Sequence, residues 1–113
     1  MAKKEIRIRC WVEIDGERFF GPGPAELLGH IEREGSITQA ARKMGMSYKK
    51  AWDIVNNLNQ GSRMPLVKST KGGSHGGNAE VTKRGKEIVA GYRALTAKLN
   101  AVLAKNKRLL KHI

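Results

Sequence analysis

The chain has 113 residues, 40% hydrophobic and 28% charged, which is the size and composition of one folded domain rather than of a disordered segment. Lysine and arginine number 22 against 10 acidic residues, and the resulting charge of +12 favours a polyanionic partner, nucleic acid before an acidic membrane surface. The single cysteine excludes an internal disulfide and a cysteine-rich zinc site. No apolar run approaches the roughly 20 residues that span a bilayer, so we expect a soluble, cytoplasmic protein without a membrane partner.

The first 22 residues are predicted to form a β-hairpin. Apolar and charged side chains alternate from Ile6 to Ile14, a period of two that is typical of a half-buried strand. Asp15 and Gly16 are a favoured turn pair, and the returning strand would contain the two phenylalanines that follow.

The next segment carries the signals of three short helices. Pro24 suits the first position of a helix that Gly35 would end, because glycine readily adopts a positive φ. Ser36 opens a second helix through a capping box with Gln39, and Ser47 caps a third. Apolar residues recur on one face of each helix, whereas the outward face of the third is rich in lysine, asparagine and glutamine. The second and third helices, joined by a glycine-containing turn, make a helix-turn-helix.

A wing and a long helix complete the predicted fold. The residues after Pro65 and the sequence AEVTK are typical of two strands flanking a glycine-rich loop, and such a hairpin after a helix-turn-helix makes a winged helix. From Thr82 a helical pattern runs to the end of the chain. We therefore predict an α+β, mainly α, fold in three parts: an N-terminal β-hairpin at 1–22, a winged helix-turn-helix DNA-binding domain at 23–82 with its wing at 66–82, and a long dimerisation helix at 83–113.

The long helix carries a heptad seam that predicts self-association. A helix of about 30 residues would be about 45 Å long, too long for a domain of this size to cover, so we expect the seam to pack on a second copy of the chain. Asn106 occupies a core position of the seam, where it would set the register, unless the last turns fray and leave it solvated. The predicted dimerisation residues are Ile88, Tyr92, Leu95, Leu99, Val102 and Leu109.

Catalytic and metal-binding patterns are missing from the sequence. The three histidines fall in separate predicted elements without ligand spacing. The glycine-rich loop lacks the residue order of a P-loop, and nothing would orient His75 as a base for the adjacent Ser74. We therefore expect a protein that is not an enzyme and that needs no cofactor or metal.

Two stretches of the sequence carry a family resemblance. They are GSITQAARKMGMSYKKAWDIVNNLNQ and PLVKSTKGGSHGGNAEVTKRGKEIV, with the markers GSI-Q-AA, MSYK-AW, GG--GG and T--G. From about Leu27 to Leu103 the chain resembles the N-terminal DNA-binding domain of ModE-type molybdate-responsive transcription regulators, with a wider kinship to LysR-type winged helices. The resemblance implies a homodimeric regulator that binds a palindromic operator in double-stranded DNA. Family regulators carry oxyanion-binding domains after the long helix, and this chain reaches only Ile113. We therefore expect a stand-alone DNA-binding domain, either a natural one-domain regulator or a fragment, in which any response to molybdate or tungstate needs a separate domain or partner.

The third helix is the expected recognition helix, with its N-terminal turns directed at base edges in the major groove. Its lysines would donate to guanine acceptors or to phosphate. Trp52 is either partial core at the helix edge or a sugar–phosphate contact, and the usual burial of large aromatic side chains favours the core. The candidate DNA contacts of this helix are Ser47, Tyr48, Lys49, Lys50 and Asn56. The candidate contacts from the wing and from neighbouring backbone positions are Thr38, Lys68, Thr70, Lys71, His75, Lys83 and Arg84.

Three other functions stay open at this stage. A non-specific architectural or RNA-binding protein would carry the same charge, but a regulator should prefer its operator over competitor DNA by roughly 10³ or more. A protein–protein adaptor built on a winged helix is disfavoured by the charge of +12. An oxyanion sensor that acts through backbone N–H groups of the wing is the third, although no residue requires it.

Overall fold

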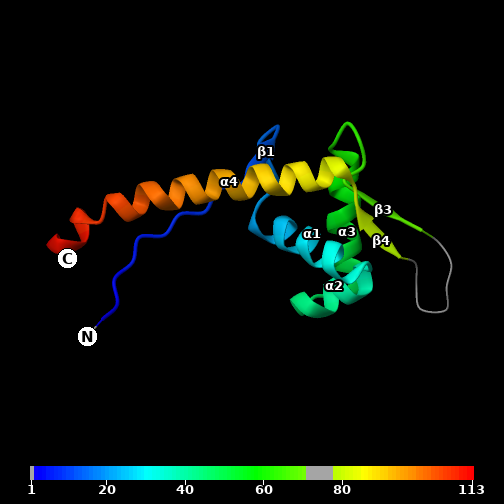
Figure 1. Cartoon of the computed structure of the whole chain (residues 1–113), viewed down its shortest axis with the longest axis horizontal. Helices are drawn as coiled ribbons and strands as arrows, with labels where there is room; N and C mark the ends of the chain where they lie inside the picture. Colours follow the sequence, from blue (N-terminus) through cyan, green and yellow to red (C-terminus); the bar gives the residue numbers. More distant parts are fainter. Residues whose placement is uncertain (1, 71–77) are drawn as a thin grey trace.

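The computed structural model describes residues 2–70 and 78–113. The elements follow in the order β1 (Val12–Ile14), β2 (Glu17–Phe20), α1 (Pro22–Glu34), α2 (Ile37–Met44), α3 (Tyr48–Gln60), β3 (Val67–Ser69), β4 (Ala79–Val81), α4 (Lys83–Lys105) and a short 3-10 helix (Arg108–His112). Strands β1 and β2 form one antiparallel pair and β3 and β4 another. The expected mainly helical winged helix-turn-helix, with an N-terminal hairpin and a long C-terminal helix, is confirmed (Figure 1).

The helix boundaries follow from local capping. Helix α1 begins at Pro22, two residues earlier than predicted, and ends at Gly35, whose φ is 68°. The Ser36 hydroxyl accepts a hydrogen bond from the Gln39 N–H at 3.2 Å and opens α2. Helix α2 ends at Gly45 with φ 65°, and the next turn leads into α3. These caps bring α2 and α3 together as a helix-turn-helix, α2 packing on both α1 and α3.

The core lies between α1, α2 and α3, and the wing strands close it. Ala40 and Ala41 of α2 and Ala51 of α3 are buried, and α2 packs on α3; small side chains let two helices approach closely. On the hairpin side the Phe20 ring packs edge-on against Tyr92 of α4, with ring centroids 5.4 Å apart. The buried apolar residues are Phe20, Ala25, Leu27, Leu28, Ile31, Ile37, Ala40, Ala41, Ala51, Val55, Leu58, Leu66, Val67, Ala79, Val81 and Val89.

The N-terminal strand is much shorter than its alternating sequence predicts. Pairing begins only at Val12, and residues 2–11 form an extended arm that runs beside α4 (Figure 1). The Tyr92 hydroxyl donates a hydrogen bond to the Cys10 carbonyl at 2.8 Å and holds the arm to the helix. Ile8, Val12 and Ile14 are 47%, 49% and 44% exposed, whereas Ile6 and Cys10 on the same face are half-buried, so only part of the predicted half-buried face is found. The reason is that a two-stranded hairpin has no second layer to cover that face.

Helix α4 also ends earlier than predicted. It spans 23 residues, about 35 Å, and stops at Lys105 instead of continuing to the end of the chain. Asn106 is its C-cap, and the Asn106 side chain donates to the Val102 carbonyl at 2.7 Å. The assignment of Asn106 to a continuous seam is therefore wrong, because asparagine side chains compete for backbone hydrogen bonds and favour helix ends. Leu109 lies beyond this break, in the 3-10 helix.

Candidate nucleic-acid interface

The N-terminal turn of α3 presents the predicted recognition residues to solvent. The Ser47 hydroxyl accepts from the Lys50 N–H at 3.1 Å, which fixes where the helix begins. Tyr48 is 53% exposed, and Lys49 and Lys50 are exposed beside it. Lys49 lies 3.2 Å from the Asp53 carboxylate, an exposed pair whose small stability leaves Lys49 free to take another anion. The structure thus brings the first four predicted residues of this helix onto one accessible turn.

Trp52 faces outward, contrary to the favoured prediction that it is core. Its side chain is 46% exposed because Ala51, Val55 and Leu58 fill the buried face of α3 and leave position 52 at the edge. Trp52 and the half-buried Asn56 line a shallow hollow between α3 and wing strand β3. This aromatic ring therefore belongs to the candidate interface.

Asn59 ties the recognition helix to the wing, and the sequence analysis missed it. Its side-chain oxygen accepts from the backbone N–H groups of Leu66 and Val67 at 2.8 and 3.1 Å. Its amide donates to the Val67 carbonyl at 2.9 Å. Asn59 is the third asparagine after Asn56 and Asn57, and no periodic pattern in the sequence distinguishes it from them. The one sequence signal for its role is its position near the end of the helix, shortly before the wing strand. The three bonds set the position of β3 relative to α3.

The beginning of α4 is held tightly against the wing. The Thr82 hydroxyl donates to the Pro65 carbonyl at 2.8 Å and accepts from the Gly85 N–H at 3.1 Å. A Cβ added at Gly85 would lie 2.3 Å from the Leu66 carbonyl oxygen, so glycine is required by this close approach. As a result, three predicted cationic contacts surround one shallow hollow: Lys68, Lys83 and Arg84.

The remaining predicted DNA contacts do not gather at one place in the described structure. Thr38 is half-buried in the first turn of α2. Thr70 closes the base of the wing, since its N–H donates to the Asn78 carbonyl at 2.8 Å. Lys71 and His75 lie outside the described residues. The predicted wing contacts are therefore grouped at Lys68, Lys83 and Arg84.

The predicted dimerisation residues divide into two sets. Ile88 and Tyr92 are half-buried and pack against the chain's own core, and Leu99 is half-buried further along α4. Leu95, Val102 and Leu109 are 48%, 56% and 54% exposed. Burial raises the pKa of the Tyr92 hydroxyl, which donates to the Cys10 carbonyl of the arm.

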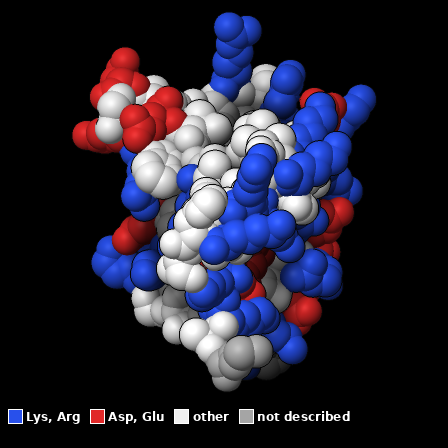
Figure 2. Space-filling model, turned by 90° about the vertical axis from the view of Figure 1, so that its left-hand side faces the viewer, with Lys and Arg blue, Asp and Glu red and all other residues white. Residues whose placement is uncertain are grey.

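Positive charge is not confined to the recognition helix and the wing. Lys and Arg side chains gather at the end of the molecule where the arm lies along the last turns of α4 (Figure 2). The basic residues of these two segments are Lys3, Lys4, Arg7, Arg9, Lys98, Lys105, Lys107, Arg108 and Lys111. Within residues 2–70 and 78–113, no helix is long and apolar enough to cross a bilayer, and no group of three or more His, Cys, Asp or Glu is arranged to hold a metal ion.

Comparison with known proteins identifies the family of the chain and several of its relatives. Residues 25–86 match the family described as bacterial regulatory helix-turn-helix protein, lysR family. The chain is 47% identical over 77 residues to the molybdenum-pterin-binding protein MopA of Rhodobacter capsulatus, covering 68% of this chain and 29% of that protein. It is 39% identical over 91 residues to the DNA-binding transcriptional dual regulator ModE of Escherichia coli (strain K12), covering 80% of this chain and 35% of that protein.

The chain thus spans about a third of the length of these curated relatives. Among solved structures, the crystal structure of the BenM_DBD/catB site 1 DNA complex matches with a TM-score of 0.55 and 18% identity, covering 78% of this chain and 92% of that chain. That likeness shows the fold. The predicted resemblance to ModE-type regulators is confirmed by the sequence identities. Because the family match covers more than half of its residues, the chain belongs to the bacterial regulatory helix-turn-helix proteins of the lysR family.

Proposed function

We propose that the protein is a cytoplasmic transcriptional regulator that binds double-stranded DNA sequence-specifically as a homodimer. The observation that carries this proposal is the capped, exposed first turn of α3, which has cationic and hydrogen-bonding side chains and is flanked by the basic hollow of the wing. The relatives named as transcriptional regulators support the same function.

In this proposal the first turn of α3 enters the major groove. Lys49 and Lys50 donate to guanine acceptors or to phosphates, and the Tyr48 ring packs on bases or sugars. Trp52 and Asn56 face the sugar–phosphate backbone between the groove and the wing. Lys68, Lys83 and Arg84 neutralise phosphates beside the wing, and Lys71 and His75, which lie outside the described residues, are further candidate contacts.

The homodimer forms through the exposed side of α4. Leu95 and Val102 are seven residues apart and about half exposed, so both lie on one stripe of the helix that the chain's own core leaves open. Ile8, Val12 and Ile14 add exposed apolar area on the arm and hairpin. A two-fold dimer would present two recognition helices to a palindromic operator. Any response to molybdate or tungstate enters through a separate domain or partner.

The test is selection of bound sequences from random duplex DNA, followed by titration of the selected site against unrelated duplex. We expect a palindromic consensus and a preference of roughly 10³ or more for that site. Equal affinity for both duplexes would instead favour the non-specific architectural protein, which the basic end of the molecule in Figure 2 would also suit. A matched pair of variants, Lys49→Ala and Lys98→Ala, separates the two ends, because only the first should lower the preference.

A further inference from the structure

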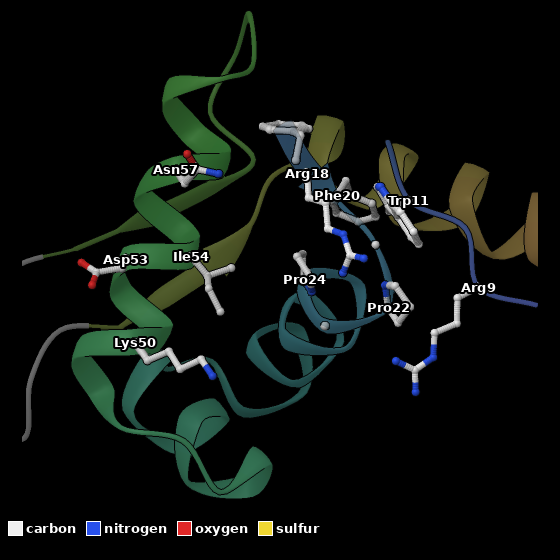
Figure 3. Close-up of a pocket in the computed structure, with 13 residues that line it drawn as sticks. Arg9, Trp11, Arg18, Phe20, Pro22, Pro24, Lys50, Asp53, Ile54 and Asn57 are labelled. Atoms are coloured by element: carbon white, nitrogen blue, oxygen red, sulfur yellow. The ribbon is translucent and has the colours of Figure 1, made fainter. Parts of the chain in front are cut away.

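An open cavity of about 520 Å³ lies between the N-terminal hairpin and the recognition helix. Its walls come from the chain before β1, from β2, from the start of α1 and from α3 (Figure 3). The volume falls within the range that holds small organic ligands. Helix α3 contributes Lys50, Asp53, Ile54 and Asn57 to this cavity, and these residues lie on the opposite side of the helix from the hollow that contains Trp52 and Asn56. It is therefore distinct from the proposed wing contacts.

The lining of the cavity combines apolar surface with unpaired cations. Phe19, Phe20, Pro22 and Pro24 contribute aromatic and ring carbons, and Ile54 adds an aliphatic wall from α3. A lone DNA phosphate would gain nothing from such carbon surface. A ligand with a flat apolar body would gain about 25 cal/mol for each Å² that it removes from water.

Three cationic side chains reach this cavity from different elements. Lys50 and Arg18 extend toward the middle of the cavity from opposite sides, and Arg9 lies at its edge (Figure 3). Among the described residues, no carboxylate lies within 4.0 Å of any of the three. The one acidic lining residue, Asp53, is already paired with Lys49. The cavity thus has a surplus of positive charge that no described residue neutralises.

Trp11 and Arg18 give the cavity a preformed flat wall. The Arg18 guanidinium lies 3.8 Å from the centroid of the Trp11 ring, and the indole N–H donates to Glu13 at 2.7 Å. Arg18 therefore stacks on the indole although Glu13 is its cross-strand neighbour. A guanidinium that stacks on an aromatic ring keeps its N–H groups available in its own plane, where they can bind a carboxylate or sulfonate.

We propose that this cavity binds a small organic anion with an aromatic body, and that the bound anion draws Lys50 away from DNA. The binding site itself is independent of the function proposed above. Its effect on DNA rests on that function, because Lys50 is also a candidate contact of the recognition helix. The DNA-binding domain would then carry an effector site of its own, formed between the hairpin and α3.

The test uses 8-anilinonaphthalene-1-sulfonate as the probe, with N-phenyl-1-naphthylamine as its uncharged analogue. Titration of the full chain should show one sulfonate site per chain, and Arg18→Gln should weaken it about tenfold through loss of a charge-assisted hydrogen bond. Lys98→Gln removes an equal charge from exposed α4 and should change the affinity less than twofold. The uncharged analogue should bind weakly, with no dependence on Arg18. Equal effects of the two substitutions, or equal binding of the two probes, would overturn the site.

Further measurements show where the sulfonate binds and whether its apolar body is needed for binding. The chain has two tryptophans, so the sulfonate should shift the indole N–H resonance of Trp11 and leave that of Trp52 in place. Val102→Gln should leave binding unchanged, and loss of the fluorescence signal in that variant would mean that the probe sits on α4 instead. Inorganic phosphate at the same concentration should not compete, because it lacks the apolar body; full competition would assign the cavity to phosphate.

The effect on DNA is measured separately, with the duplex obtained by selection. Saturating sulfonate should raise the dissociation constant for that duplex by about fivefold or more, and by linkage the duplex should weaken the sulfonate by the same factor. Lys50→Gln should abolish this coupling and weaken sulfonate binding, and the remaining binding should still depend on Arg18. If no duplex binds at all, the proposed function fails while the sulfonate titration still reports the site. An unchanged duplex affinity with sulfonate bound would overturn the coupling.

Discussion

Replacement of Asn59 by alanine should loosen the wing from the recognition helix and destabilise the whole chain. The substitution removes three hydrogen bonds to the backbone of Leu66 and Val67, which are 0% and 2% exposed. Each backbone group left without a partner costs about 1–3 kcal/mol, less where water can reach it, so the sum should be about 2–4 kcal/mol. For a domain of this size, that is a fall in Tm of roughly 10–25 °C.

The assay is urea and thermal unfolding followed by circular dichroism, with Asn57→Ala as the matched control. Asn57 is the exposed asparagine two positions earlier on the same helix, so its replacement should change the free energy of unfolding by about 0.5 kcal/mol or less. Asn59→Asp should fall between the two, since it keeps an acceptor for the two N–H groups and loses the donor to Val67. If Asn59→Ala and Asn57→Ala unfold at the same urea concentration, the three hydrogen bonds do not hold the wing.

Three further predictions follow from the packing and charge of α4. Gly85→Ala should destabilise the chain by about 2 kcal/mol or more in the same unfolding assay, because its Cβ would lie 2.3 Å from a backbone oxygen. The control is Gly91→Ala, whose Cβ meets nothing within 4 Å and which should stabilise the chain by up to about 1 kcal/mol. Arg84→Ala should lower the slope of log affinity against log salt by about 1 in DNA titrations, and an unchanged slope would refute its phosphate contact. Val102→Asp should give monomers by sedimentation with an unchanged unfolding midpoint, because the side chain is 56% exposed, and a persisting dimer would place the interface elsewhere.

The sequence predicted well those features that depend on a few neighbouring residues. Ser36 and Ser47 cap their helices through the hydroxyl acceptors expected of them, and Gly35 has the positive φ expected at the end of its helix. Each of these depends on interactions within one turn of helix. The same locality explains why the candidate contacts on the first turn of α3 are found together in the structure.

Features that depend on distant packing were harder to predict. Trp52 is a large aromatic residue beside a buried alanine, and its exposure depends on how the wing strand crosses α3. Residues 6–11 continue the strand pattern of β1, yet within residues 2–70 and 78–113 no strand pairs with them. Asn59 carries no periodic signal at all, because its three partners come from a strand that its own helix does not specify. In each case the missing information is the position of a second element.

The two sides of α3 are held by different interactions, hydrogen bonds on the wing side and apolar contacts on the hairpin side. On the wing side Asn59 makes three hydrogen bonds to β3, and Thr82 fixes β3 to α4, so wing and helix form one rigid unit. On the hairpin side, within the described part of the chain, no hydrogen bond joins α3 to β1 or β2, and the contacts are apolar ones around an open cavity. A ligand that enters at the hairpin can therefore reorient the Lys50 side chain without breaking a hydrogen bond between α3 and the hairpin. A ligand on the wing side would have to break the Asn59 bonds, so the hairpin side is the edge of α3 on which an effector can act at low cost.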